Sequence, residues 1–425
     1  MKGIFLFLVL LCCVYQNFPL VNYVGEIGRS PVILLTPFFL VYLSFKRSIS
    51  LSIYSRVYIS YITYLLIISC LYIVFVYIQI GEFSFLEENI IIKSLKMVVY
   101  PMTSLLLYFF FTEFLKKTGR LRILHRSIYV LLCFLLVLLF YEIKYYKTED
   151  AFMPYLHSDG LKYWRIRLLT MESSWAGSVV IIISLLNVFL ANYLNYQKWF
   201  KYVCYFFSIF FLVYYTIHSE SKGFLLLLLL AFLPMLISLY KKYKILRWYL
   251  LLSIVPLGFL TGFVYNYLYF EIQSNFFVHG TFGTRITGYL SSLEVFLFNP
   301  FGVGLGPYVF VYTNHIENVI NYDFMASLDL GEVSGYLNST KFLSTKTYFF
   351  DHLIFGGVGF IFFFWMFFIK RYISIRKIPH FPILRIGLVF ILLSGVFYIT
   401  YGVKYDVWMF FAVLDALERK QECLK

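Results

Sequence analysis

Charged residues are scarce in this sequence, and their scarcity excludes a water-soluble globular fold. Only 14% of the 425 residues are Asp, Glu, Lys or Arg, whereas 61% are hydrophobic. A soluble chain of this length has too little interior to hide so much apolar surface. Long apolar runs recur instead at the length that crosses a bilayer. The sequence therefore predicts an all-α, polytopic integral membrane protein.

The sequence has no cysteine spacing typical of disulfide-rich or metal-binding proteins, and it has none of the common catalytic signature motifs. Five of the six cysteines lie inside apolar runs and one lies in the basic tail, so we expect neither a disulfide framework nor a metal site. The sequence contains no Walker motif, no H-E-x-x-H, no G-x-S-x-G and no D-x-D that would hold a metal and a nucleotide-sugar. We therefore expect no metal, no cofactor and no soluble nucleotide donor.

Apolar runs of spanning length predict about twelve transmembrane helices. The runs lie at 3–21, 31–45, 57–80, 97–115, 127–145, 172–194, 202–218, 223–240, 248–269, 353–369, 386–402 and 407–417. Lys and Arg concentrate in every second loop and at both ends of the chain, and most acids lie in the alternate loops. The positive-inside rule then places the basic loops and both termini in the cytoplasm. The net charge of +14 is an orientation signal and not a nucleic-acid footprint.

One expected outer loop, 270–352, is far longer than a connection between two spans requires. Its sequence is rich in aromatic residues and partly helical in pattern, so we expect a folded extracytoplasmic loop that packs on the membrane helices. No internal repeat of fixed period is visible, which weakens a transporter built from inverted repeats. We expect residues 1–425 to form a single membrane domain that contains this loop.

Cations are rare in the expected outer loops, so the few that occur there are candidate binding groups. Arg165 and Glu172 stand seven residues apart, with Arg167 between them, and would share one face of a helix. They form either an interfacial ion pair with ordinary helix capping, or a phosphate-binding arginine oriented by a carboxylate. Lys222 begins a span after a short Ser/Gly turn, where it either completes the turn or contacts an anion at the helix start.

Arg285 is the strongest candidate, because no Lys or Arg follows it until Lys341 and the chain then breaks at Pro300 into a glycine series. The glycines of the series are Gly302, Gly304 and Gly306. A nucleotide-binding fold would need a βαβ unit around them, and the pattern offers none. Close backbone approach by glycine beside an isolated arginine instead suits a polar head group or a pyrophosphate.

Four pieces of the chain, in order, resemble the O-antigen polymerase and O-antigen ligase superfamily of bacterial inner membranes. The pieces are RIRLLTMESSWAG from Arg165, SESKGFLLLLLL from Ser219, TRITGYLSSLEVFLFNPFGVGLGPY from Thr284 and LSTKTYFFDHLIFGGVGFIFFF from Leu343. Leu168 stands where the family often has glycine. In the ligase branch a His-Asn pair usually precedes the final Gly-x-x-Gly, and its place here holds roughly Thr345-Lys346. The missing histidine favours a polymerase over a ligase.

The resemblance implies a metal-independent membrane glycosyltransferase. It would polymerise oligosaccharide repeat units carried on undecaprenyl pyrophosphate into O-antigen, as in lipopolysaccharide biosynthesis, or into a related surface polysaccharide. The implied location is the bacterial cytoplasmic (inner) membrane. The implied partners are the lipid-linked oligosaccharide and the lipid bilayer, with a chain-length-regulating membrane protein as a further candidate. The alternatives are O-antigen ligase activity on the same fold and a lipid-linked oligosaccharide transporter, or flippase.

On this interpretation Arg165 and Arg285 clamp the pyrophosphate and stabilise the charge on the leaving group. Glu172 either orients Arg165 or accepts the proton of the attacking hydroxyl. His352 follows a candidate capping residue, Asp351, and is either a base or an interfacial histidine. The expected substrate-binding residues are Lys222, Arg167, Gly302, Gly304, Gly306 and His352.

Overall fold

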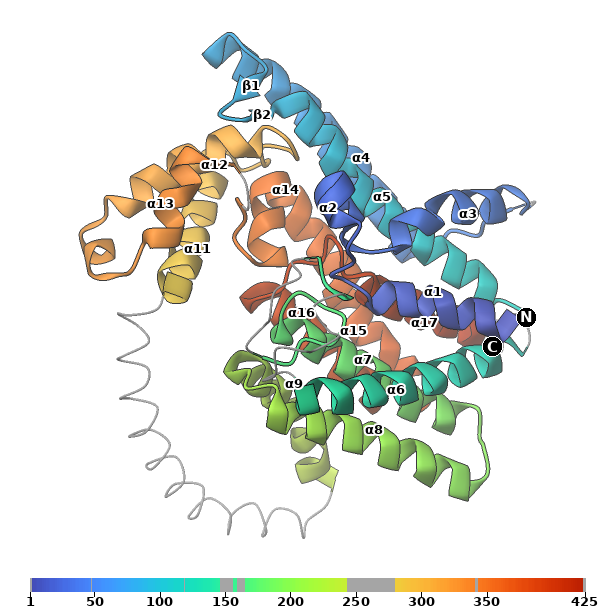
Figure 1. Ribbon diagram of the computed structural model, residues 1–425. Coiled ribbons are helices and arrows are strands. Elements are labelled where there is room, and N and C mark those ends of the chain that lie inside the picture. Colours follow the sequence, from blue (N-terminus) through green and yellow to red (C-terminus); the bar gives the residue numbers. More distant parts are fainter. Residues whose placement is uncertain are drawn as a thin grey trace. The chain divides into compact units, whose positions relative to one another are not determined.

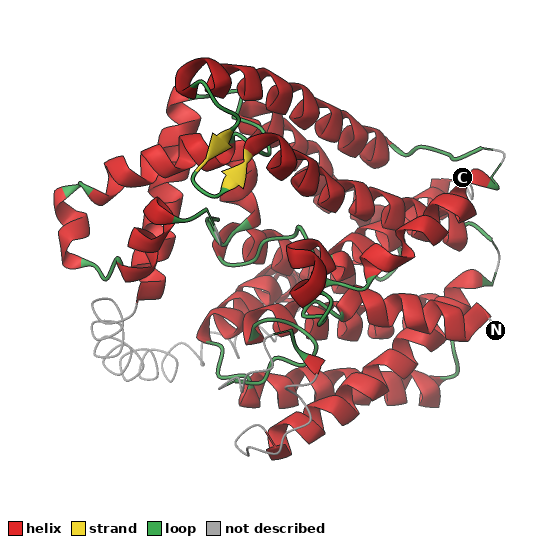
Figure 2. Cartoon of the chain, turned by 45° about the horizontal axis from the view of Figure 1, so that its top comes forward, coloured by secondary structure: helices red, strands yellow, loops and turns green. Residues whose placement is uncertain are grey.

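The computed structural model describes residues 2–46, 48–117, 119–145, 156–158, 165–242, 280–340 and 343–422. These residues are mostly helical, and the single sheet among them is a short antiparallel hairpin of β1 (Ser84–Phe85) and β2 (Glu88–Asn89). Figure 2 shows the hairpin in yellow among the red helices. The all-α class expected from the sequence is confirmed.

Six helical stretches in the described residues are long and apolar enough to cross a membrane. They are α4 (Ile53–Ile80), α5 (Ile90–Leu115), α6 (Arg120–Tyr145), α7 (Ser173–Tyr193), α8 (Lys198–His218) and the stretch Tyr348–Lys377, which begins with α14 (Tyr348–Phe364). A bent pair of helices, Val21–Arg29 and Val32–Ser44, would make a seventh span. These helices support a polytopic membrane protein.

The described helices do not reach the expected number of about twelve spans. α1 (Lys2–Val14) and α16 (Phe381–Phe397) are apolar but short, as is the apolar part of α9 (Lys222–Lys242). α17 (Tyr405–Glu422) carries charge at both ends, and the expected span at 248–269 lies outside the described residues. The remaining short helices are α2 (Val21–Val24), α3 (Val32–Ser44), α15 (Lys370–Ser374), the 3-10 turns at Gly25–Arg29, Asp323–Ser327 and Ile375–Lys377, and a π-helical turn at Trp365–Ile369.

The chain divides into two compact units. Unit 1 comprises Met1–Thr63, Lys96–Ala231 and Phe362–Lys425. Unit 2 comprises Tyr64–Leu95 and Phe232–Ile361. Within unit 2, α11 (Gly280–Phe298), α12 (Tyr308–Ile320) and α13 (Gly331–Asn338) pack on one another (Figure 1). These three helices occupy much of the described part of the expected long loop, whose extracytoplasmic position stays a prediction.

α7 is the central helix of unit 1. In its most apolar stretch 83% of the residues are buried, against 22% in α8. α7 packs against α6, α8, α16 and α17, and Figure 1 shows α6, α7 and α8 side by side. A helix that is apolar on all sides is stable when neighbours surround it. α8 instead exposes Phe206, Val213 and Ile217, as expected of a helix that faces lipid.

Candidate functional site

The segment from Arg165 to Glu172 leads directly into α7 in unit 1, and a buried carboxylate fixes its backbone. Glu142, near the C-terminal end of α6, accepts hydrogen bonds from the backbone N–H groups of Arg167 at 2.8 Å and Leu168 at 2.9 Å. The carbonyl of Leu169 accepts a hydrogen bond from the backbone of Gln16 at 2.9 Å. Leaving either of these backbone N–H groups without an acceptor would cost about 1–3 kcal/mol, because both residues are buried. The arginine segment is therefore held firmly against two other parts of the unit.

The segment from Arg165 to Glu172 is not a helix, so the two residues do not share the helix face that a helical segment would give them. Leu168 has a φ of 49°, in the left-handed region that favours glycine, and the backbone N–H of Thr170 closes a turn onto the carbonyl of Arg167 at 2.9 Å. α7 begins only at Ser173. Leu168 is itself buried, and its packing offsets the strain.

The three charged candidates of this segment differ in exposure. Arg167 is buried, Arg165 is partly exposed, and Glu172 is exposed. Glu172 has an extended backbone at the N-cap of α7, but its side chain makes no cap hydrogen bond to that helix, among the residues described here. The hydroxyl of Ser174 donates to Glu172 Oε2 at 3.3 Å. The carboxylate thus stands at the helix start without serving as its cap.

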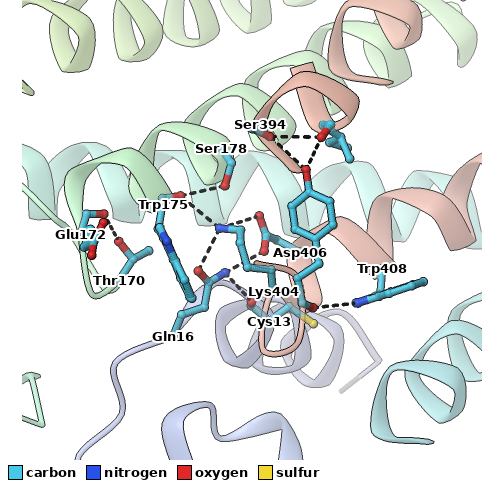
Figure 3. A network of polar contacts seen from close by, with 12 residues as sticks. Cys13, Gln16, Thr170, Glu172, Trp175, Ser178, Ser394, Lys404, Asp406 and Trp408 are labelled. Carbon is cyan, nitrogen blue, oxygen red and sulfur yellow. Dashed lines mark hydrogen bonds and ion pairs between the residues drawn. The ribbon is translucent and has the colours of Figure 1, made fainter. Parts of the chain in front are cut away.

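A fully buried lysine lies directly behind the start of α7 (Figure 3). Lys404 Nζ donates to the carbonyl oxygen of Trp175 at 3.1 Å and to Gln16 Oε1 at 3.0 Å, and it lies 3.6 Å from Asp406 Oδ2. Gln16 Nε2 donates to Asp406 Oδ1 at 2.7 Å. Both charged side chains have 0% exposure. A buried ion pair of this kind persists when hydrogen bonds satisfy most of its donors and acceptors. Here Gln16 bonds to both charged groups, whereas Asp406 Oδ2 is buried without a hydrogen-bond partner among the described residues and has only the charge of Lys404 close to it.

Sequence reasoning did not select Lys404, although a signal was present. It is the one Lys or Arg between Arg385 and Arg419, and Asp406 follows two residues later. An isolated charge in apolar surroundings is costly unless a partner is close, so such a pair indicates a built site. Burial lowers the pKa of Lys404 to about 8, and the negative charge of Asp406 opposes the shift. The contributions of Gln16 and Trp175 could not have been inferred from spacing.

Lys222 is the first residue of α9 and is exposed, as an anion contact at a helix start would need to be. The residue Glu220, in the turn before it, has a φ of 50°. Gly223 leaves ordinary space for a side chain, since an added Cβ would lie 4.0 Å from the Tyr398 ring. Lys222 lies in unit 1, as does the whole Arg165–Glu172 segment.

The glycine series of unit 2 makes close contacts with other parts of the protein. Gly302 and Gly304 have φ values of 83° and 80°, which suit glycine alone. A Cβ on Gly302 would lie 2.5 Å from the carbonyl oxygen of Phe355, and a Cβ on Gly304 or Gly306 would overlap α4 or α5. The backbone at these glycines therefore lies close to α4, α5 and α14 of the same unit.

Backbone hydrogen bonds join the glycine series to a break in α14. The N–H groups of Val303 and Gly304 donate to the carbonyls of Ile354 and Phe355 at 2.9 and 3.0 Å. The N–H of Val358 donates back to Pro300 at 2.8 Å, next to the kink at Gly357. These glycines hold the loop in shape, and a substrate contact through their N–H groups would have to displace these bonds. Their role in substrate binding stays a prediction.

Arg285 is partly exposed on α11. Burial raises the pKa of Tyr289, one turn further on, and the positive charge of Arg285 opposes that shift, so the two side chains lie near each other. His352, on α14, packs among aromatic rings: its ring centroid lies 4.3 Å from that of Tyr348 and 5.5 Å from that of Phe360. This setting suits an interfacial histidine at least as well as a base.

The candidate residues fall into both units. Arg165, Arg167, Glu172 and Lys222 belong to unit 1, whereas Arg285, the three glycines and His352 belong to unit 2. No protein-family model matches the chain, and comparison with curated proteins and with solved structures finds no match either.

Proposed function

We propose that the chain is a glycosyltransferase of the bacterial cytoplasmic membrane, with about twelve spans and both termini inside. It joins oligosaccharide repeat units carried on undecaprenyl pyrophosphate into O-antigen or a related surface polysaccharide. The observation that carries the proposal is the fixation of the arginine segment by Glu142, which accepts two backbone hydrogen bonds at the entrance to α7. A guanidinium on a rigid backbone can stabilise a leaving diphosphate without reorganising during the reaction.

The proposed reaction needs only groups that the chain supplies. The hydroxyl oxygen of the acceptor sugar forms a bond to the anomeric carbon of the donor, and the bond from that carbon to the pyrophosphate oxygen breaks. The departing undecaprenyl pyrophosphate carries the negative charge, which Arg165 and Arg285 stabilise with help from Lys222. Glu172 is exposed, and it either accepts the hydroxyl proton or orients Arg165, in which case the proton passes to the departing pyrophosphate.

Contacts within unit 1 support the proposed topology. Segments expected outside touch one another: Gln16 bonds to Leu169, and Lys404 bonds to the carbonyl of Trp175. Segments expected inside do the same, since Ser127 donates to the carbonyl of Gly3 at 3.2 Å. Arg419 likewise donates to the carbonyl of Ser50 at 2.9 Å. Each pairing joins two segments, either loops or the ends of expected spans, that the count of Lys and Arg assigns to the same side of the membrane.

A transporter is the second candidate, and one observation favours it. Ionisable groups buried among membrane helices often mark the path of an ion or a substrate, and the Lys404–Asp406 pair has 0% exposure. A flippase for lipid-linked oligosaccharides would use such a pair to couple transport to a proton. The pair lies beside the first turn of α7, however, where it also bonds the carbonyl of Trp175 and can simply support the arginine segment.

The glycan phenotype of cells that lack the chain distinguishes the candidates. A polymerase mutant should place single repeat units on its surface, because units are still exported and ligated. A ligase mutant would accumulate lipid-linked polymer, and a flippase mutant would show no outward-facing units. Gel analysis of surface glycan, together with extraction of the lipid-linked pool, separates these three outcomes. Either of the last two would contradict the polymerase proposal.

A further inference from the structure

A polar cluster in unit 2 connects α11, α13 and the loop before α14. Its centre is Glu332, whose carboxylate accepts hydrogen bonds from the hydroxyl of Tyr336 at 2.6 Å and from the hydroxyl of Thr284 at 3.2 Å. Lys346 Nζ lies 3.4 Å from the same carboxylate. The side chains of Glu332 and Lys346 remain 48% and 40% exposed, so both charged groups are accessible to a ligand.

Lys346 has a backbone conformation that lysine rarely adopts. Its φ is 62°, in the left-handed region, which costs a residue with a side chain on the order of 1–3 kcal/mol. An exposed ion pair such as the one with Glu332 contributes at most about 1 kcal/mol. The ion pair therefore does not explain the strain. Strain of this kind persists where the surrounding structure enforces it, and it is concentrated at functional sites.

The buried carboxylate of Asp351 enforces the conformation of Lys346. It accepts hydrogen bonds from the backbone N–H of Thr345 at 2.8 Å, from the hydroxyl of Thr345 at 2.9 Å and from the hydroxyl of Ser344 at 3.0 Å. The N–H of Lys346 donates in turn to the hydroxyl of Ser344 at 3.0 Å. These bonds hold the backbone at Lys346 in its left-handed conformation, from which the side chain reaches Glu332.

The cluster borders the part of α11 that carries Arg285. Thr284, which bonds Glu332, is the residue immediately before Arg285. Gly288, one turn further along α11, leaves room for the loop, since an added Cβ would lie 3.3 Å from Cα of Thr345. Residues three apart are neighbours on a helix surface, so the loop passes close to Arg285. The ring of Tyr289 stacks on that of Phe350 at 4.4 Å, which adds an aromatic surface nearby.

The chemistry of the cluster selects a neutral, hydroxyl-rich ligand. Glu332 and Lys346 carry opposite charges, so the pair attracts neither a diphosphate nor a free cation as a whole. A divalent cation needs several oxygen ligands, and the described residues contain no group of three metal-binding side chains. Sugar hydroxyls both donate and accept hydrogen bonds, and so match a carboxylate next to an ammonium. Burial opposes ionisation of Glu332, but Tyr336, Lys346 and Thr284 together lower its pKa, which keeps the carboxylate an acceptor at neutral pH.

We propose that Glu332 and Lys346 form a saccharide-binding subsite, which holds the sugar next to the diphosphate that Arg285 contacts. The proposal rests on the proposed function, because it assigns this site to the same lipid-linked substrate. Glu332 accepts hydrogen bonds from the sugar hydroxyls, and Lys346 donates to the sugar oxygens. The subsite therefore determines which sugar is accepted, whereas Arg285 recognises the diphosphate common to all such substrates.

Binding to the purified full-length chain in lipid nanodiscs tests the subsite with two probes. One probe is the oligosaccharide repeat unit released from its lipid, and the other is undecaprenyl pyrophosphate without sugar. Glu332→Gln and Lys346→Gly should each weaken binding of the saccharide about tenfold or more and leave binding of the lipid diphosphate within about twofold. Arg285→Ala should do the reverse. Glu317→Gln, at an exposed acid of α12, is the matched control and should change neither.

Lys346→Gly distinguishes a loss of saccharide binding from a loss of stability, because it removes the ammonium group without straining the backbone. Glycine adopts the left-handed backbone without strain, so this variant should unfold at the same or a higher temperature while it loses the ammonium group. Saccharide binding equal to wild type in Lys346→Gly and Glu332→Gln would overturn the subsite and leave the proposed function intact. An equal loss of both probes would also overturn it, by showing a purely structural cluster. Wild-type chain that binds neither probe would overturn the proposed function itself.

Discussion

The ammonium nitrogen of Lys404 lies 3.1 Å from the carbonyl oxygen of Trp175, in the first turn of α7. The bond connects the start of α17 to the helix at the centre of unit 1, three residues beyond Glu172. It is one of three contacts that surround this nitrogen, the others being Gln16 and Asp406. The ion pair therefore supports the helix start that presents the candidate arginine segment.

Lys404→Met should destabilise the protein by about 3–5 kcal/mol, because it leaves Asp406 buried without its partner. The double variant Lys404→Met with Asp406→Leu should recover most of that loss, since no charge is then left buried. Thermal unfolding of the detergent-solubilised protein measures both. Lys198→Met, at an exposed position, serves as the control. A single variant as stable as wild type would show that Asp406 does not need the ammonium group.

Stability should also rise with pH in the alkaline range because of Lys404. Its pKa is about 8 in the folded protein, below the usual value of 10.5, so the folded state releases the proton first. Between these two values the unfolded chain binds more protons, and the free energy of unfolding therefore increases with pH. Unfolding temperatures measured from pH 7.5 to 10 should rise more steeply in wild type than in the double variant. Identical slopes would contradict the assignment to Lys404.

Helix positions were predictable because apolar runs of spanning length have few alternatives in a membrane. The expected runs at 172–194 and 202–218 agree with α7 and α8 to within a few residues at each end. Whether Arg165 and Glu172 share a helix face could not be decided from spacing, since Glu142 lies far away in the sequence and fixes a non-helical backbone there. Spacing within one segment carries no information about such a partner.

The sequence could suggest which kinds of residue form the candidate site, but it could not show which parts of the chain these residues contact. The glycine series suggested close backbone approach to a head group or a pyrophosphate, and the sequence did not reveal that the backbone lies against Phe355 and Ser69. Lys404 and Lys346 were not selected, since their significance comes from burial in one case and from a left-handed backbone in the other. Both properties depend on contacts made by distant parts of the chain.

Gly302→Ala should be strongly destabilising. The backbone of Gly302 is left-handed, and the new Cβ would lie 2.5 Å from the carbonyl oxygen of Phe355, so α14 would have to move. We expect a loss of about 1–3 kcal/mol or more. Gly335→Ala is the matched control in the same unit: it lies inside α13 in open space, and it should stabilise by roughly 0.5–1 kcal/mol. Thermal unfolding compares the two, and equal effects would show that the Gly302 contact is not rigid.

Glu142→Gln should loosen the arginine segment and reduce polymer formation. A glutamine amide has one acceptor oxygen, so it can keep only one of the two hydrogen bonds from Arg167 and Leu168. Leaving one of these buried N–H groups without an acceptor costs about 1–3 kcal/mol, equivalent to roughly a fivefold to 150-fold loss of activity if the segment must be ordered. Limited proteolysis of the membrane-embedded chain should show faster cleavage near residue 165. Wild-type polymer amounts in this variant would show that the fixation is not needed for activity.

Arg165→Ala and Arg285→Ala should each abolish most polymer formation while the protein remains in the membrane at normal levels. Each removes a cation that stabilises the departing diphosphate, which is worth roughly 2.7–4 kcal/mol, or about a hundredfold to thousandfold in rate. Cells lacking the chain and complemented with each variant report the result as the length and amount of surface glycan. Arg376→Ala is the matched control, since Arg376 is an exposed arginine in an expected cytoplasmic loop and should leave polymer unchanged. Normal polymer from both site variants would exclude the diphosphate clamp, whereas a loss from one alone would assign the leaving group to that unit.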